Sequence, residues 1–139
     1  MKIVIDTNVL IAALRSRKGA SYKLFSLVQS GVFTPVLSLP LYLEYEEVIM
    51  RQVNSGVFLH EAGENLLDFI CYNFEHQELH YQWRPMLNDP KDEMVLETLF
   101  NSRSQYLITY NKKDFTAVKE LKNRILDAKE FLTLIGDIR

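Results

Sequence analysis

Short apolar segments rich in Ile, Val and Leu alternate along this chain with longer segments of helical periodicity, and this alternation limits the possible folds most strongly. The first apolar segment, residues 2–6, runs directly into Thr7 and Asn8, either of which can begin a helix. Further strands are predicted at residues 33–38, near 79–83, at 106–110 and around 125–126. Strands separated by helices predict an α/β domain, a three-layer sandwich with a parallel five-stranded sheet.

Helix start signals place the segments between these strands. Pro40 fits the first turn of a helix over residues 41–51, and Asp89 caps another that runs to about residue 100. Asp127 and Glu130 form a capping-box pattern at the start of the last helix. The remaining helices are expected at residues 9–14, 22–28 and about 57–74. Pro35 lacks a donor for the sheet, so the second strand is expected mainly at residues 36–38.

Length and composition agree with one globular domain over residues 1–139. The 139 residues are 47% hydrophobic and 24% charged, which is enough to bury a core. We expect a cytoplasmic protein without a membrane segment, because no apolar run approaches about 18 residues and the first residues lack the features of a signal peptide. The single cysteine, Cys71, permits no disulfide within the chain. The net charge of -2 lacks the basic signature of many nucleic-acid binders, although a site made of carboxylates would itself lower it.

Acidic and amide side chains follow two of the predicted strands. Asp6 ends the first strand, and Asn111 and Asp114 come just after the strand at 106–110. The carboxyl ends of parallel strands meet at one edge of a sheet, where ligands bind in open α/β folds. The ordinary alternative is that these residues are helix caps or turn residues, as most aspartates after strands are.

Two further acids lie on apolar helix faces, where a charge is costly. Glu44 stands four residues before Val48, and Asp92 stands four residues before Leu96. Both carboxylates are therefore expected to point inward. For Asp92 the alternative is a capping role together with Asp89.

Carboxylates gathered in a buried place repel one another unless a cation compensates them. Oxygen ligands favour hard ions, so Mg²⁺ or Mn²⁺ is the expected metal. Such a site suits metal-assisted hydrolysis of a phosphodiester. His76 and His80 bring no third ligand for a competing site, and the chain has no glycine-rich loop for a nucleotide phosphate.

Taken together, these motifs resemble those of the PIN-domain family. The resemblance lies in four segments in the family's order: IVIDTNVL (3–10), SLPLYLE (38–44), DPKD (89–92) and LITYNKKDF (107–115). It implies strand order 3-2-1-4-5 and Mg²⁺- or Mn²⁺-dependent cleavage of single-stranded RNA. It also implies an acidic quartet and a set of polar supporting residues. The quartet is Asp6, Glu44, Asp92 and Asp114, and the supporting residues are Thr7, Asn8, Asp89, Thr109 and Asn111.

Within that family, the segment LEYEEVIMR (43–51) is similar to VapC-like toxins of bacterial toxin–antitoxin pairs. This resemblance implies a homodimer held inactive by a small antitoxin protein. One departure concerns Tyr110 and Asn111, which stand where many relatives carry Gly-Asp. Asp114 is then the only acid in this last motif, so the sequence does not decide whether the site binds one metal ion or two.

Three other functions stay open at this stage. The chain can be a catalytically weak PIN-fold binding or scaffold module, or a housekeeping RNA-processing nuclease. A phosphatase or phospho-receiver of another fold is disfavoured because Asn8 stands where an Asp-x-Asp motif requires an acid. Several basic residues are candidate phosphate contacts, although solvated surface charges need no such role: Arg15, Arg17, Lys18, Lys112 and Lys113.

Overall fold

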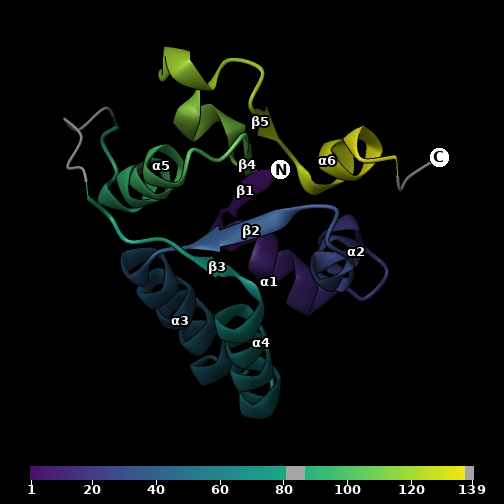
Figure 1. Cartoon of the computed structure of the whole chain (residues 1–139). Coiled ribbons are helices and arrows are strands. Elements are labelled where there is room, and N and C mark those ends of the chain that lie inside the picture. Colours follow the sequence, from purple (N-terminus) through teal and green to yellow (C-terminus); the bar gives the residue numbers. More distant parts are fainter. Residues whose placement is uncertain (81–86, 137–139) are drawn as a thin grey trace.

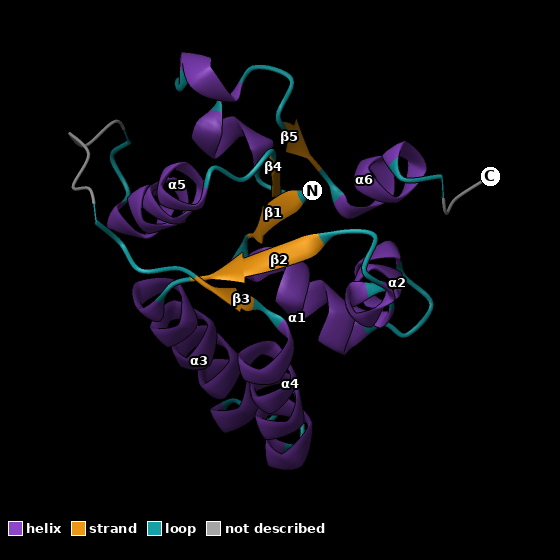
Figure 2. Ribbon diagram, viewed as in Figure 1, coloured by secondary structure: helices purple, strands orange, loops and turns teal. Residues whose placement is uncertain are grey.

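A parallel five-stranded sheet forms the centre of the protein (Figure 1, Figure 2). The computed structural model describes residues 1–80 and 87–136. The strands are β1 (Lys2–Ile5), β2 (Thr34–Leu37), β3 (Glu75–His76), β4 (Tyr106–Ile108) and β5 (Ile125–Leu126). Their order is β3-β2-β1-β4-β5, and every pair is parallel. The predicted fold class and strand order are confirmed.

Helices surround this sheet. They are α1 (Thr7–Arg15), α2 (Ala20–Ser26), α3 (Leu39–Asn54), α4 (His60–Asn73), α5 (Pro90–Ser102) and α6 (Ala128–Leu134), with short 3₁₀ helices η1 (Val28–Ser30), η2 (Lys112–Phe115) and η3 (Lys119–Leu121). In Figure 1, α5 lies on one side of the central strands, and α1 and α2 lie on the other. Among the described residues, no helix has the length and apolar character needed to cross a membrane.

The first strand runs through the middle of the core. Ile3, Val4 and Ile5 are fully buried, as expected for a central strand of a parallel sheet with helices on both faces. Phe33, just before β2, packs edge-on against Phe131 of α6 with ring centroids 5.2 Å apart. At the carboxyl end of β1, the buried Ile5 pairs with Ile108 of β4, and Asp6 follows directly.

Two predicted strand positions were wrong in part. The third strand lies at Glu75–His76 instead of 79–83, and residues 81–83 of that prediction lie outside the described residues. Both strand residues are exposed, so β3 has no apolar pattern to reveal it. The second strand includes Pro35, which pairs with Ile3, and it ends before Ser38.

Candidate active site

The acids named above meet at the carboxyl edge of the sheet, in one pocket of about 450 Å³. Eight of the nine residues expected at the site line this pocket: Asp6, Thr7, Asn8, Glu44, Asp89, Asp92, Asn111 and Asp114. The ninth, Thr109, is fully buried and contacts Asp6. We call this the acid pocket. It gathers residues from the ends of β1 and β4 and from α3 and α5, which are far apart in sequence.

Asp6 is nearly buried and held by three donors. Its Oδ1 accepts a hydrogen bond from the Thr7 amide at 2.8 Å. Its Oδ2 accepts from Thr109 Oγ1 at 2.7 Å and from Asn8 Nδ2 at 3.2 Å. Burial raises the pKa of the Asp6 carboxyl in spite of these hydrogen bonds, which act in the opposite direction. Asp6 is thus the helix cap of α1 and also a fixed acid facing the acid pocket.

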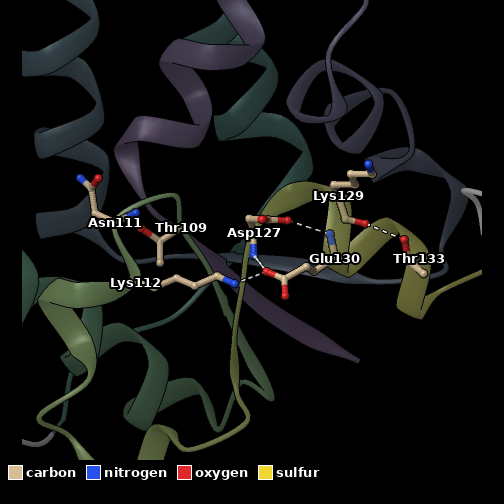
Figure 3. A network of polar contacts seen from close by, with 7 residues as sticks. All are labelled: Thr109, Asn111, Lys112, Asp127, Lys129, Glu130 and Thr133. Atoms are coloured by element: carbon tan, nitrogen blue, oxygen red, sulfur yellow. Dashed lines mark hydrogen bonds and ion pairs between the residues drawn. The ribbon is translucent and has the colours of Figure 1, made fainter.

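Thr109 and Asn8 connect the start of α1 to the end of β4. Thr109 Oγ1 accepts from Asn8 Nδ2 at 3.2 Å and from the Asn111 amide at 3.0 Å, while it donates to Asp6. Figure 3 shows Thr109 beside Asn111. Asn8 Oδ1 in turn accepts from the Tyr110 amide at 3.0 Å. These bonds fix the geometry of the loop that leads to Asp114.

Asp92 and Asp89 both belong to the beginning of α5. The Asp89 side chain caps this helix by accepting from the Lys91 amide at 2.9 Å. Asp92 faces the acid pocket, where burial and then repulsion from Asp89, Asp114 and Asp6 raise its pKa to about 6. A carboxyl with so high a pKa among other acids lies where a cation would be favourable.

Glu44 brings an acid from α3, and its charge is compensated by a lysine. The Glu44 side chain is only 9% exposed, and its Oε1 lies 3.3 Å from Lys91 Nζ. Ser38 caps α3 by accepting from the Leu41 amide at 3.3 Å. The Ser38 hydroxyl also lies 2.7 Å from Thr98 Oγ1 of α5, so the two acid-bearing helices are joined near the acid pocket.

Asp114 lies on η2 and is more exposed than the other three acids. Lys112, on the same turn, forms an ion pair with Glu130 of α6. Glu130 also completes the capping box with Asp127, as Figure 3 shows. The hydrogen bonds to Asp127 and Lys112 keep the pKa of Glu130 below its usual value. The Lys112–Glu130 ion pair therefore attaches the turn that carries Asp114 to α6.

Two basic residues of the acid pocket were missed as site residues in the sequence interpretation: Lys91 and Arg15. Lys91 had a local signal, since it lies between Asp89 and Asp92 in the DPKD motif. Arg15, at the end of α1, was named only as one of several candidate phosphate contacts.

The acid pocket fits a hard divalent cation by the chemistry of its donors. Its acids and amides offer oxygen ligands, which suit Mg²⁺ or Mn²⁺. Within the described residues, no group of three or more Asp, Glu, His or Cys side chains is close enough to hold an ion by itself. Mg²⁺ usually binds proteins through one or two carboxylates, with water and substrate oxygens as the other ligands.

Comparisons with known proteins give a family and a fold. The family model described as "PIN domain" matches residues 2–113. Among solved structures, one similar chain comes from the crystal structure of VapBC2 from Rickettsia felis bound to a DNA fragment from their promoter. The TM-score is 0.59 at 17% identity, and the match covers 91% of this chain and 98% of that chain. The search of curated proteins found no match.

Proposed function

Because the chain belongs to the PIN-domain family, we propose that it is a metal-dependent endoribonuclease that cleaves single-stranded RNA. The observation that carries the proposal is the meeting of Asp6, Glu44, Asp92 and Asp114 in one pocket. We assign these four residues to catalysis at a Mg²⁺ or Mn²⁺ ion, which one or two of their carboxylates would bind together with water and substrate oxygens.

The chain's own residues then have separate tasks. When bound, a divalent cation would lower the pKa of a water molecule and neutralise charge on the phosphate. Asp6 offers a rigid oxygen ligand, because Thr109 and Thr7 hold its two oxygens in place. Lys91 forms an ion pair with Glu44 at 3.3 Å, which orients the Glu44 side chain. Asn111 supplies an uncharged polar group at the rim of the acid pocket.

We further propose that the enzyme is the toxin of a toxin–antitoxin pair and acts in the cytoplasm as a homodimer. The support is the similarity in fold to a chain of a VapBC2 structure. Co-expression with the protein encoded by an adjacent reading frame tests this proposal. A small protein that co-purifies and inhibits RNA cleavage is expected, whereas an active nuclease without such a partner would favour a housekeeping role in RNA processing.

A catalytically weak binding module is the second candidate function. The observation in its favour is Asn111, which lines the acid pocket without adding a charge. Titration calorimetry with Mn²⁺ separates the two functions. Binding that is lost in Asp6→Asn supports the nuclease, and no heat of binding in the wild-type protein supports the module.

Cleavage of a labelled single-stranded RNA with Mg²⁺ or Mn²⁺ tests the proposed function directly. Asp6→Asn preserves the shape and the helix cap but removes the charge, so we expect at least about a 100-fold loss of rate. The matched control is Glu120→Gln, which removes an exposed acid on η3. Equal rates for wild type and Asp6→Asn would refute the proposed mechanism.

A further inference from the structure

A second pocket, of about 650 Å³, lies between α2 and α6 and has a basic lining. Among the described residues that line it, four are cationic, namely Arg17, Lys18, Lys23 and Lys129, and none is acidic. We call it the basic pocket. In a chain with a net charge of -2, four cations around one pocket are a local reversal of the overall charge.

Three of these cations form no ion pair with any residue that the structure describes. In the part of the chain that the structure describes, the lysine and arginine ion pairs use Lys2, Arg51, Lys91 and Lys112. Arg17, Lys18 and Lys129 are exposed and take part in none of these pairs. Figure 3 shows Lys129 leaving α6 on a different side from the Lys112–Glu130 pair. Their charges are therefore available to a ligand.

The basic pocket is connected to the acid pocket in two ways. Arg15 lines the acid pocket and stands two residues before Arg17. In addition, the Ser21 hydroxyl lies 2.7 Å from the Tyr110 hydroxyl, which anchors α2 to the residue that follows Thr109. Asp6 and Arg15 are separated by the length of α1, about 14 Å at 1.5 Å per residue. A few nucleotides of extended single strand cover such a distance.

Tyr22 adds an aromatic surface to this charge. The side chain lines the basic pocket and is 42% exposed. Proteins that bind single strands combine cations for the backbone with aromatic rings on which bases stack. An acidic peptide would use the cations but would gain little from an exposed ring.

We infer that the basic pocket binds the backbone of the single-stranded RNA that enters the acid pocket, with Tyr22 as a stacking platform for a base. This inference rests on the proposed function for the identity of the nucleic acid. The physical reason for the inference is that the carboxylates of the acid pocket repel phosphates, so nearby cations must hold the RNA strand. The cations of the basic pocket do not line the acid pocket, so they leave its carboxylates free to bind the metal ion.

Binding of a fluorescent 12-nucleotide RNA, measured by anisotropy in EDTA at several salt concentrations, tests the inference without catalysis. We expect the triple variant Arg17→Ala/Lys18→Ala/Lys129→Ala to lose at least about tenfold in affinity at 0.1 M salt, with the salt slope reduced by about 2. Tyr22→Ala should weaken binding about fivefold or more, and Tyr22→Phe should bind like wild type. The control is Lys119→Ala/Lys122→Ala, two exposed lysines that precede β5. All variants should keep the wild-type melting temperature.

The outcomes separate this inference from the proposed function. Wild-type affinity and salt slope in the triple variant would overturn the inference, even if the protein cleaves RNA. Competition by polyglutamate as effective as by RNA, with Tyr22→Ala unchanged, would also overturn it in favour of an acidic protein partner. Weaker RNA binding by the triple variant and by Tyr22→Ala would support it, even if no cleavage is found.

Discussion

Replacing Asp92 with asparagine should stabilise the metal-free protein while it removes catalysis. Partial burial of the Asp92 carboxyl and repulsion from four nearby acids raise its pKa to about 6. Asparagine has nearly the same shape and no charge. The substitution therefore removes an unfavourable charge from the folded protein and leaves the Asp89 cap of α5 intact.

The sign and size of the effect follow from the pKa. In the unfolded chain Asp92 ionises near 3.8, and in the folded protein near 6. The folded state therefore holds the proton more tightly. The contribution of this group to the free energy of unfolding is full below about pH 4 and is lost as the pH rises to about 6. Full burial would make this difference worth about 3 kcal/mol, but solvent screens a partly exposed group, so we expect about 1 kcal/mol at pH 8. For a chain of this size that corresponds to a rise of about 3 °C in melting temperature.

Thermal unfolding in EDTA at pH 3.5 and at pH 8, with Glu120→Gln as the control for an exposed acid, measures this effect. The gain of Asp92→Asn over wild type should be present at pH 8, absent at pH 3.5 and reversed by Mg²⁺, which stabilises the wild type by binding. RNA cleavage by the variant should fall at least about 100-fold. A variant that is equally or less stable than wild type at both pH values would refute the assignment of Asp92 to a crowded acidic site.

Three further substitutions test a hydrogen bond to Asp6, the cap of α3 and the packing of α3 against α4. Thr109→Val keeps the buried shape but removes the hydroxyl that donates to Asp6, so we expect a loss of about 1–3 kcal/mol in unfolding by urea and weaker Mn²⁺ binding in calorimetry. Ser38→Ala removes the cap of α3 and should cost about 1 kcal/mol in the same unfolding assay, whereas Ser38→Thr should cost less. Gly63→Ala places a Cβ 3.1 Å from Ile49 Cγ2 between α4 and α3, which should cost about 1–3 kcal/mol; a melting temperature equal to wild type would show that the two helices separate easily.

Much of the fold could be predicted because local signals agree with it. The apolar segment before Asp6 is a buried central strand, and the Asp127 and Glu130 pattern is a true capping box. Prediction was weakest at β3, where two exposed residues pair with Val36 and Leu37 of β2 and show no apolar pattern. Such a short edge strand takes its conformation from its neighbour and has no periodicity of its own.

In the candidate site, too, some features follow from local sequence patterns and others from contacts between distant residues. The sequence placed Asp6 at a strand end and Glu44 on an inward helix face, because strand and helix periodicity are local properties. The pairing of Glu44 with Lys91, 47 positions later, depends on the packing of α3 against α5. Helix and strand periodicity relate residues only a few positions apart, so they cannot predict this pair.

By itself, the sequence determined which residues end strands and cap helices, and hence which acids could meet at one edge of a parallel sheet. Only the tertiary structure decided how these acids differ. It buries Asp6 under three hydrogen bonds and leaves Asp114 exposed on a turn. It also joins Arg17 and Lys129, which are 112 positions apart, in one basic pocket. The physical reason is that charge and burial depend on neighbours in space, and the fold chooses those neighbours from distant parts of the chain.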